Sequence, residues 1–122
     1  MTKYGEVIAL DTSNFEQTIT KEPIVFVDFW ATWCAPCTQF SAIYERVAAA
    51  SPHVLFAKVD VEKAPELSEI FEIRSIPHVM VFKEGIAIYS DSGSLPESVL
   101  NELVEQALNA DVSDIKEQLD EA

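Results

Sequence analysis

Two cysteines separated by two residues, Cys34 and Cys37, constrain this 122-residue chain more than any other feature, because the sequence contains no others. The segment 24–30 ahead of them is an apolar, β-branched and aromatic run that predicts a buried strand. Behind them, apolar residues recur at the three- and four-residue spacing of an amphipathic helix: Phe40, Ile43, Tyr44 and Val47. The cysteines therefore lie where a strand turns into a helix.

That position indicates the chemistry of the pair. Unpaired amides and the positive end of the backbone dipole at a helix start stabilise a thiolate. We expect Cys34 to be exposed and to attack, and Cys37, one turn further in, to be shielded and to resolve the mixed disulfide. Pro36 stiffens the loop and suits a first helical turn. A metal half-site is the alternative, but only His53 and His78 could add ligands.

The segment Val27-Asp28-Phe29-Trp30-Ala31-x-Trp33-Cys34-x-Pro36-Cys37 resembles the active-site segment of the thioredoxins, in particular the bacterial type. Further matches follow in order: Lys58-Val59-Asp60, Arg74-Ser75-Ile76-Pro77, Phe82-Lys83-Glu84-Gly85 and Gly93. The resemblance implies an α/β thioredoxin fold, with a central mixed five-stranded sheet flanked by about four helices. It also implies reduction of protein disulfides through a reversible Cys34–Cys37 disulfide, no bound cofactor, and re-reduction by a thioredoxin-reductase-type flavoprotein.

Asp28 interrupts an otherwise apolar strand, on the same face as Ile24 and Phe26. A buried carboxylate has a raised pKa, which suits a base that takes the proton of Cys37 during resolution. The resemblance makes Lys58, on the next strand, the partner of this aspartate. The alternative is an ordinary solvent-facing residue on an alternating strand.

The resemblance also implies a substrate-binding surface. Ile76-Pro77 matches the family's cis-proline loop, which faces the disulfide and offers backbone groups to an extended substrate segment. Trp33 is expected to be a surface aromatic of the docking area, whereas Trp30 is expected to pack near the site. The expected substrate-binding residues are Trp33, Ala35, Pro36, Ile76, Pro77 and Gly93.

Four residues depart from the family pattern. Ala35 and Ser75 replace glycines, Ala42 replaces a helix-kinking proline, and His78 replaces a threonine. The catalytic residues are retained, so these changes affect the docking surface. We expect His78 to tune the redox potential, with its ring facing either Cys34 or Asp28; the alternative is a neutral histidine at a strand start.

Composition and charge narrow the function further. The chain carries 21 acidic and 8 basic residues, which gives a net charge of −13. This charge disfavours binding to nucleic acid and favours binding to partners with basic patches. The alternative is that the charge serves solubility alone. No apolar run is long enough to span a membrane, and the N-terminal residues lack the pattern of a signal peptide. We therefore expect a cytoplasmic monomer that binds neither nucleic acid nor membrane.

The order of predicted elements is β-α-β-α-β-α-β-β-α. Strands are expected at about 6–10, 24–29, 54–59, 79–82 and 86–90, and helices to about 20 and at about 35–50, 64–71 and 95–108. We expect a single thioredoxin domain over 1–122, with 110–122 as an acidic extension. In that extension Val112, Ile115 and Leu119 share a helical face, so it forms a short docked helix or a frayed terminus.

Two other functions remain open at this point. A thioredoxin-fold oxidant or isomerase would usually carry a histidine between the cysteines, where this chain has Pro36. A binding or chaperone module would carry the dithiol only incidentally.

Overall fold

The computed structural model describes residues 4–121, and the side chains of residues 4–119. Its five strands form one sheet in the order β1-β3-β2-β4-β5. The strands are β1 (Val7–Leu10), β2 (Ile24–Trp30), β3 (Leu55–Asp60), β4 (His78–Lys83) and β5 (Ile86–Ser92). The strands β1, β3 and β2 are parallel, whereas β4 runs antiparallel to β2 and β5 antiparallel to β4. The expected mixed five-stranded sheet is confirmed.

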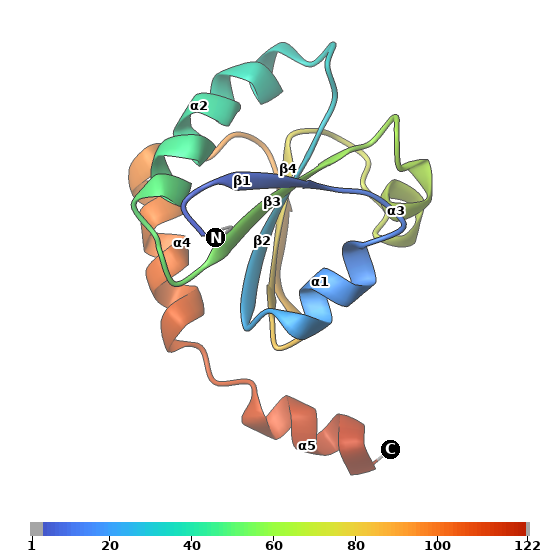
Figure 1. Ribbon diagram of the computed structural model, residues 1–122, viewed down its shortest axis with the longest axis vertical. Helices are drawn as coiled ribbons and strands as arrows, with labels where there is room; N and C mark the ends of the chain where they lie inside the picture. The colour runs from blue at the N-terminus through green and yellow to red at the C-terminus, as the bar shows by residue number, and fades with distance from the viewer. Residues whose placement is uncertain (1–3, 122) are drawn as a thin grey trace.

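Helices cover both faces of this sheet. Figure 1 shows α2 and α4 on one side and α1 and α3 on the other. The helices are α1 (Phe15–Lys21), α2 (Ala35–Ala49), α3 (Pro65–Ile70), α4 (Glu97–Asn109) and α5 (Ser113–Glu121). All the predicted elements are present, and their ends lie within a few residues of the predicted ones. For α1 only the end was predicted. None of the described residues belongs to a helix that is long and apolar enough to cross a membrane.

The central strand β2 divides the core in two. Ile24 and Phe26 face the cluster beneath α2 and α4, whereas Val25, Val27 and Phe29 face the cluster beneath α1 and α3. All of β2 except its last residue is buried, as expected for a strand with helices over both faces. The same alternation directs Asp28 toward α2, the helix that carries the cysteines.

The acidic extension contains a helix, α5, that lies apart from the sheet and the other helices in Figure 1. Val112 just ahead of it is 3% exposed, and Lys116 Nζ lies 2.9 Å from Glu84 Oε1 in the turn between β4 and β5. Ile115 and Leu119 remain 45% and 62% exposed, so most of the apolar face of α5 meets solvent. The segment thus contains a helix, but of the three residues expected to dock, Val112 is buried while Ile115 and Leu119 are exposed.

Candidate active site

Cys34 is the N-cap of α2, and its sulfur accepts a hydrogen bond from the backbone N–H of Cys37, with the nitrogen 3.2 Å away. Pro36 lies in the first helical turn, where its missing amide costs no helical hydrogen bond. A sulfur that accepts this bond at the positive end of a helix is favoured as an anion once the disulfide is reduced. The strand-to-helix placement inferred from the sequence is therefore confirmed.

The two cysteines form a disulfide, with their Cα atoms 5.2 Å apart. Their exposures are 5% for Cys34 and 2% for Cys37, so the prediction that Cys34 would be exposed is wrong. Cys34 is covered because the loop around Ile76 and the residue Val61 pack against the turn that holds the pair. Cys34 nevertheless lines an open groove, and Cys37 does not.

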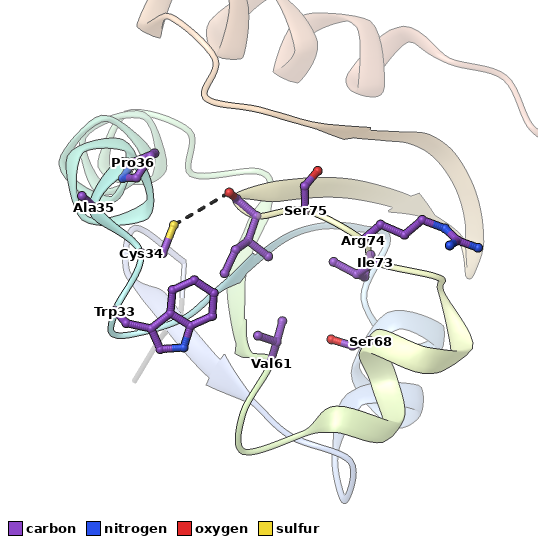
Figure 2. A pocket seen from close by; sticks show the side chains of 10 residues that line it. Trp33, Cys34, Ala35, Pro36, Val61, Ser68, Ile73, Arg74 and Ser75 are labelled. Carbon is purple, nitrogen blue, oxygen red and sulfur yellow. Dashed lines mark hydrogen bonds between the residues drawn. The ribbon is translucent and has the colours of Figure 1, made fainter.

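The Ile76-Pro77 peptide bond is cis, as expected. It brings the Ile76 carbonyl oxygen to 3.8 Å from Cys34 Sγ, the dashed line in Figure 2. That contact becomes a hydrogen bond only when Cys34 carries a thiol proton. Gly93, directly after β5, has a φ of 107° and donates its N–H to the Pro77 carbonyl at 2.8 Å, so it supports this loop.

A groove of about 490 Å³ runs beside Cys34. Figure 2 shows Cys34 and Pro36 on one side and Arg74 at the opposite end. Trp33, at its rim, is 66% exposed, in agreement with the expected surface aromatic. Pro77 and Gly93, expected at the substrate surface, are not among the described residues that line it. The lining residues are Trp33, Cys34, Ala35, Pro36, Val61, Ser68, Ile73, Arg74, Ser75 and Ile76.

Asp28 is 3% exposed, and its Oδ1 has no hydrogen-bond partner among the described residues. Burial raises the pKa of Asp28 to about 7, and the nearby Lys58 charge opposes this only in part. Asp28 and Cys37 both line a second cavity, of about 240 Å³, with Trp30, Thr38, Ser41 and Lys58. A polar cavity of that size accommodates several water molecules, which could carry a proton between the two side chains and the surface.

Lys58 acts on Asp28 through space. The two residues are paired in register on β2 and β3, but no ion pair or hydrogen bond joins their side chains among the described residues. Lys58 Nζ instead lies 5.1 Å from the centroid of the Trp30 ring, in a cation–π contact. Trp30 packs against the cysteine pair, as expected.

Among the described residues, the contacts of the His78 ring are with Ser90 and Phe29 rather than with Cys34 or Asp28. It is paired with Phe29 across β2 and β4, and therefore lies on the sheet face opposite Asp28. Its Nε2 is 2.8 Å from Ser90 Oγ, and its ring centroid is 6.2 Å from that of Phe29. Partial burial lowers the pKa of His78, and Asp91 opposes that shift only in part. The expectation that the ring faces Asp28 is wrong, because strand alternation turns it away.

Several residues of the site were not singled out from the sequence. Thr38 and Ser41 border the cavity of Asp28, and Val61 and Ser68 line the groove. Tyr44 was assigned only to the helix core, yet its hydroxyl donates to the Ala57 carbonyl at 2.8 Å, and burial and the Asp28 charge raise its pKa well above its ordinary value. The spacing of Thr38 and Ser41 after Cys37, on one helical face, is a signal that could have identified them.

The site therefore combines a disulfide at a helix start, a cis-proline loop against it and a buried carboxylate behind it. No group of three or more His, Cys, Asp or Glu side chains that could hold a metal ion occurs among the described residues. Together with the fold, these features define a thiol–disulfide oxidoreductase whose redox group is the cysteine pair.

Comparisons with known proteins agree with this class. The chain matches the sequence model of the Thioredoxin family over residues 6–106. It is 41% identical to "Putative thioredoxin 2" of Streptomyces coelicolor, over 93% of this chain and 85% of that protein. It is 36% identical to "Thioredoxin C-3" of Corynebacterium nephridii, over 84% of this chain and 72% of that protein. The chain belongs to the thioredoxin family and is a protein-disulfide reductase.

Solved structures support the fold. The oxidised thioredoxin of Plasmodium falciparum aligns with a TM-score of 0.75 at 32% identity, covering 83% of this chain and 97% of that one. A mutant thioredoxin of Halobacterium salinarum aligns with a TM-score of 0.83 at 22% identity, covering 91% and 98%. The second likeness shows that the fold is retained where most residues differ.

Proposed function

We propose that Cys34 is the attacking thiolate, that Cys37 resolves the mixed disulfide, and that Asp28 accepts the Cys37 proton. The observation that carries this assignment is the shared cavity of Asp28 and Cys37, together with an Asp28 Oδ1 that has no hydrogen-bond partner among the described residues. A carboxyl group with a pKa of about 7 exchanges protons readily near neutral pH, as a general base must.

The reaction moves two electrons from the dithiol to the substrate. The Cys34 thiolate attacks one sulfur of a substrate disulfide, and the other substrate sulfur leaves as a thiolate that takes a proton from solvent. Asp28 then removes the Cys37 proton, and the Cys37 thiolate attacks Cys34 Sγ. The bond from Cys34 to the substrate breaks, the second substrate thiolate leaves, and the Cys34–Cys37 disulfide of the structure remains.

The wider role follows from the need to regenerate the dithiol. A thioredoxin-reductase-type flavoprotein would return two electrons to the disulfide, which places the protein in electron transport and cell redox homeostasis. We place it in the cytoplasm, where dithiols are kept reduced. The protein would act as a monomer and a single domain over 1–122, without a bound cofactor, and its partners would be protein disulfides rather than nucleic acid or membrane.

An insulin-disulfide reduction assay tests the function. With dithiothreitol as electron source, the protein should accelerate the precipitation of the insulin B chain, and Cys34→Ser should not. A second arm replaces dithiothreitol with NADPH and a thioredoxin reductase, and consumption of NADPH would support the proposed electron source. No acceleration in the first arm would exclude protein-disulfide reduction, whereas failure of the second arm alone would exclude only that reductase.

A further inference from the structure

The groove beside Cys34 has one charged side chain in its lining. Arg74 is that residue, and none of the described lining residues is acidic, although the chain carries 21 acidic residues. The other lining residues of the groove are mostly apolar or carry a hydroxyl group. Its walls include Trp33, Val61 and Ile73, and its two serines are Ser68 and Ser75. The described lining therefore carries one cation and no anion, on a protein whose net charge is −13.

The Arg74 guanidinium is available to a bound segment. Its ion-pair partner within the chain is Glu72, at 3.4 Å, and the two side chains are 84% and 76% exposed. An exposed pair at that distance contributes little, and a guanidinium has five N–H donors, so a second carboxylate can bind without displacing the first. The desolvation cost of such a contact is small, because the Arg74 side chain is largely exposed.

The position of Arg74 along the groove determines which part of a bound segment it can contact. Cys34 lies at one end and Arg74 at the other (Figure 2). A segment whose cysteine sulfur reaches Cys34 therefore presents a side chain at a fixed distance along its own sequence to Arg74. A carboxylate at that position finds a cation, whereas one elsewhere along the segment meets no cation among the described lining residues.

From this arrangement we infer that Arg74 is a specificity-determining residue that selects disulfide-containing protein segments with an acidic side chain on one side of the reactive cysteine and apolar residues between them. The inference rests on the proposed function, since it names the substrate class of the same site. The acidic residue is recognised by charge and by the planar donors of the guanidinium, and the apolar stretch by the groove walls.

The test uses peptides whose single cysteine is joined by a disulfide to the same chromogenic thiol. The three positions before the cysteine and the three after it are tested one at a time. Each peptide carries one aspartate at the tested position, and its matched peptide carries asparagine there. The rate constant for release of the chromogenic thiol by the reduced protein is measured for each pair at low salt. The readout is the aspartate-to-asparagine ratio at each position.

We expect the ratio to rise to about two- to fivefold at one or two adjacent positions on one side only, and to shrink at high salt. Arg74→Gln should lower the aspartate-to-asparagine ratio at those positions to about one, and Arg74→Glu should bring it below one. Arg46→Gln is the matched control, because Arg46 is the other arginine of the chain, pairs with Glu97 between α2 and α4, and does not line the groove. It should keep the peak.

The outcomes distinguish failure of the proposed function from failure of the inference about Arg74. If no peptide releases its thiol, the proposed function fails. If all peptides react with ratios near one, or if Arg74→Gln keeps the peak, reduction stands and the inference about Arg74 is wrong. A general fall of all rate constants with rising protein concentration would mean that a second copy of the chain fills the groove, and would overturn the inference too.

Discussion

Asp28 and Lys58 are register partners on β2 and β3, yet the Lys58 ammonium lies over the Trp30 ring and makes no ion pair with the carboxylate. The Lys58 charge therefore opposes the rise in the pKa of Asp28 but does not cancel it. A direct ion pair would lower the pKa of the carboxyl, whereas burial here raises it to about 7. The separation keeps Asp28 able to gain and lose a proton near neutral pH.

The first prediction concerns the rate of resolution. Asp28→Asn removes the proton acceptor, so decay of a preformed mixed disulfide should slow by about 100-fold at pH 7, the low end of the range for a general base. The wild-type rate should rise through about pH 7 as Asp28 ionises, and the variant should lack that inflection. Stopped-flow measurement from pH 5 to 9 checks this, and identical pH profiles would remove Asp28 from the step.

The same substitution should stabilise the fold above neutral pH. The folded pKa of Asp28, about 7, exceeds the unfolded value, so the contribution of this carboxyl is fully present below about pH 4 and is lost as pH rises through 7. Oxidised Asp28→Asn should therefore exceed wild type by about 2–4 kcal/mol at pH 8, and the difference should narrow toward pH 4. Urea unfolding at both pH values measures it, and a gap that widens on acidification would contradict the raised pKa.

The division of labour between the cysteines predicts different trapping behaviour. Cys37→Ser should accumulate covalent mixed disulfides on Cys34, because the attack occurs and resolution cannot. Cys34→Ser should trap almost nothing, since Cys37 is 2% exposed and does not line the groove. Non-reducing gels and mass spectrometry after incubation with a disulfide substrate distinguish the two variants. Trapping by Cys34→Ser alone would reverse the assignment.

His78 gives a prediction about redox potential. Its pKa is lowered by partial burial, so the ring is largely neutral at pH 7–8 and has little charge to act on the dithiol. His78→Thr should then share the wild-type potential within about 10 mV at pH 8, and a difference should appear only below about pH 6, with the wild type more oxidising. Equilibration with glutathione at pH 5.5 and 8 measures both. A gap of about 30 mV at pH 8 would show that the ring acts through something other than its charge.

Lys83 predicts a stability effect far from the dithiol. Its Nζ donates hydrogen bonds to three carbonyls at the end of α4, those of Ala107, Leu108 and Ala110, at 2.7, 3.1 and 2.5 Å. A cation there satisfies groups that lack helical partners and complements the dipole. Lys83→Met should lower the free energy of unfolding by about 1–2 kcal/mol.

Lys116→Met is the matched control for that measurement. Lys116 pairs with Glu84 on the surface, with both side chains nearly half exposed, so its removal should cost less than about 1 kcal/mol. Equal losses in the two variants would mean that the carbonyl contacts of Lys83 contribute no more than an exposed ion pair.

The local pattern of the chain determined the elements and the identity of the redox pair. The apolar run of β2 and the helical spacing after Cys37 predicted a strand-to-helix turn, and alternation along β2 predicted that Asp28 shares a buried face with Phe26. These features depend on neighbours in sequence, so periodicity reveals them. The cis bond before Pro77 followed from resemblance, because one proline is a weak signal by itself.

Tertiary structure alone decided the surroundings of the dithiol. The burial of Cys34, the gathering of Val61, Ser68 and Arg74 around one groove, and the turn of His78 toward Ser90 all join segments distant in the chain. They follow from the order in which β3, β2, β4 and β5 pair and from how the connecting loops pack at one end of the strands. Side-chain periodicity assigns a residue to a face but carries no information about which other segment covers that face.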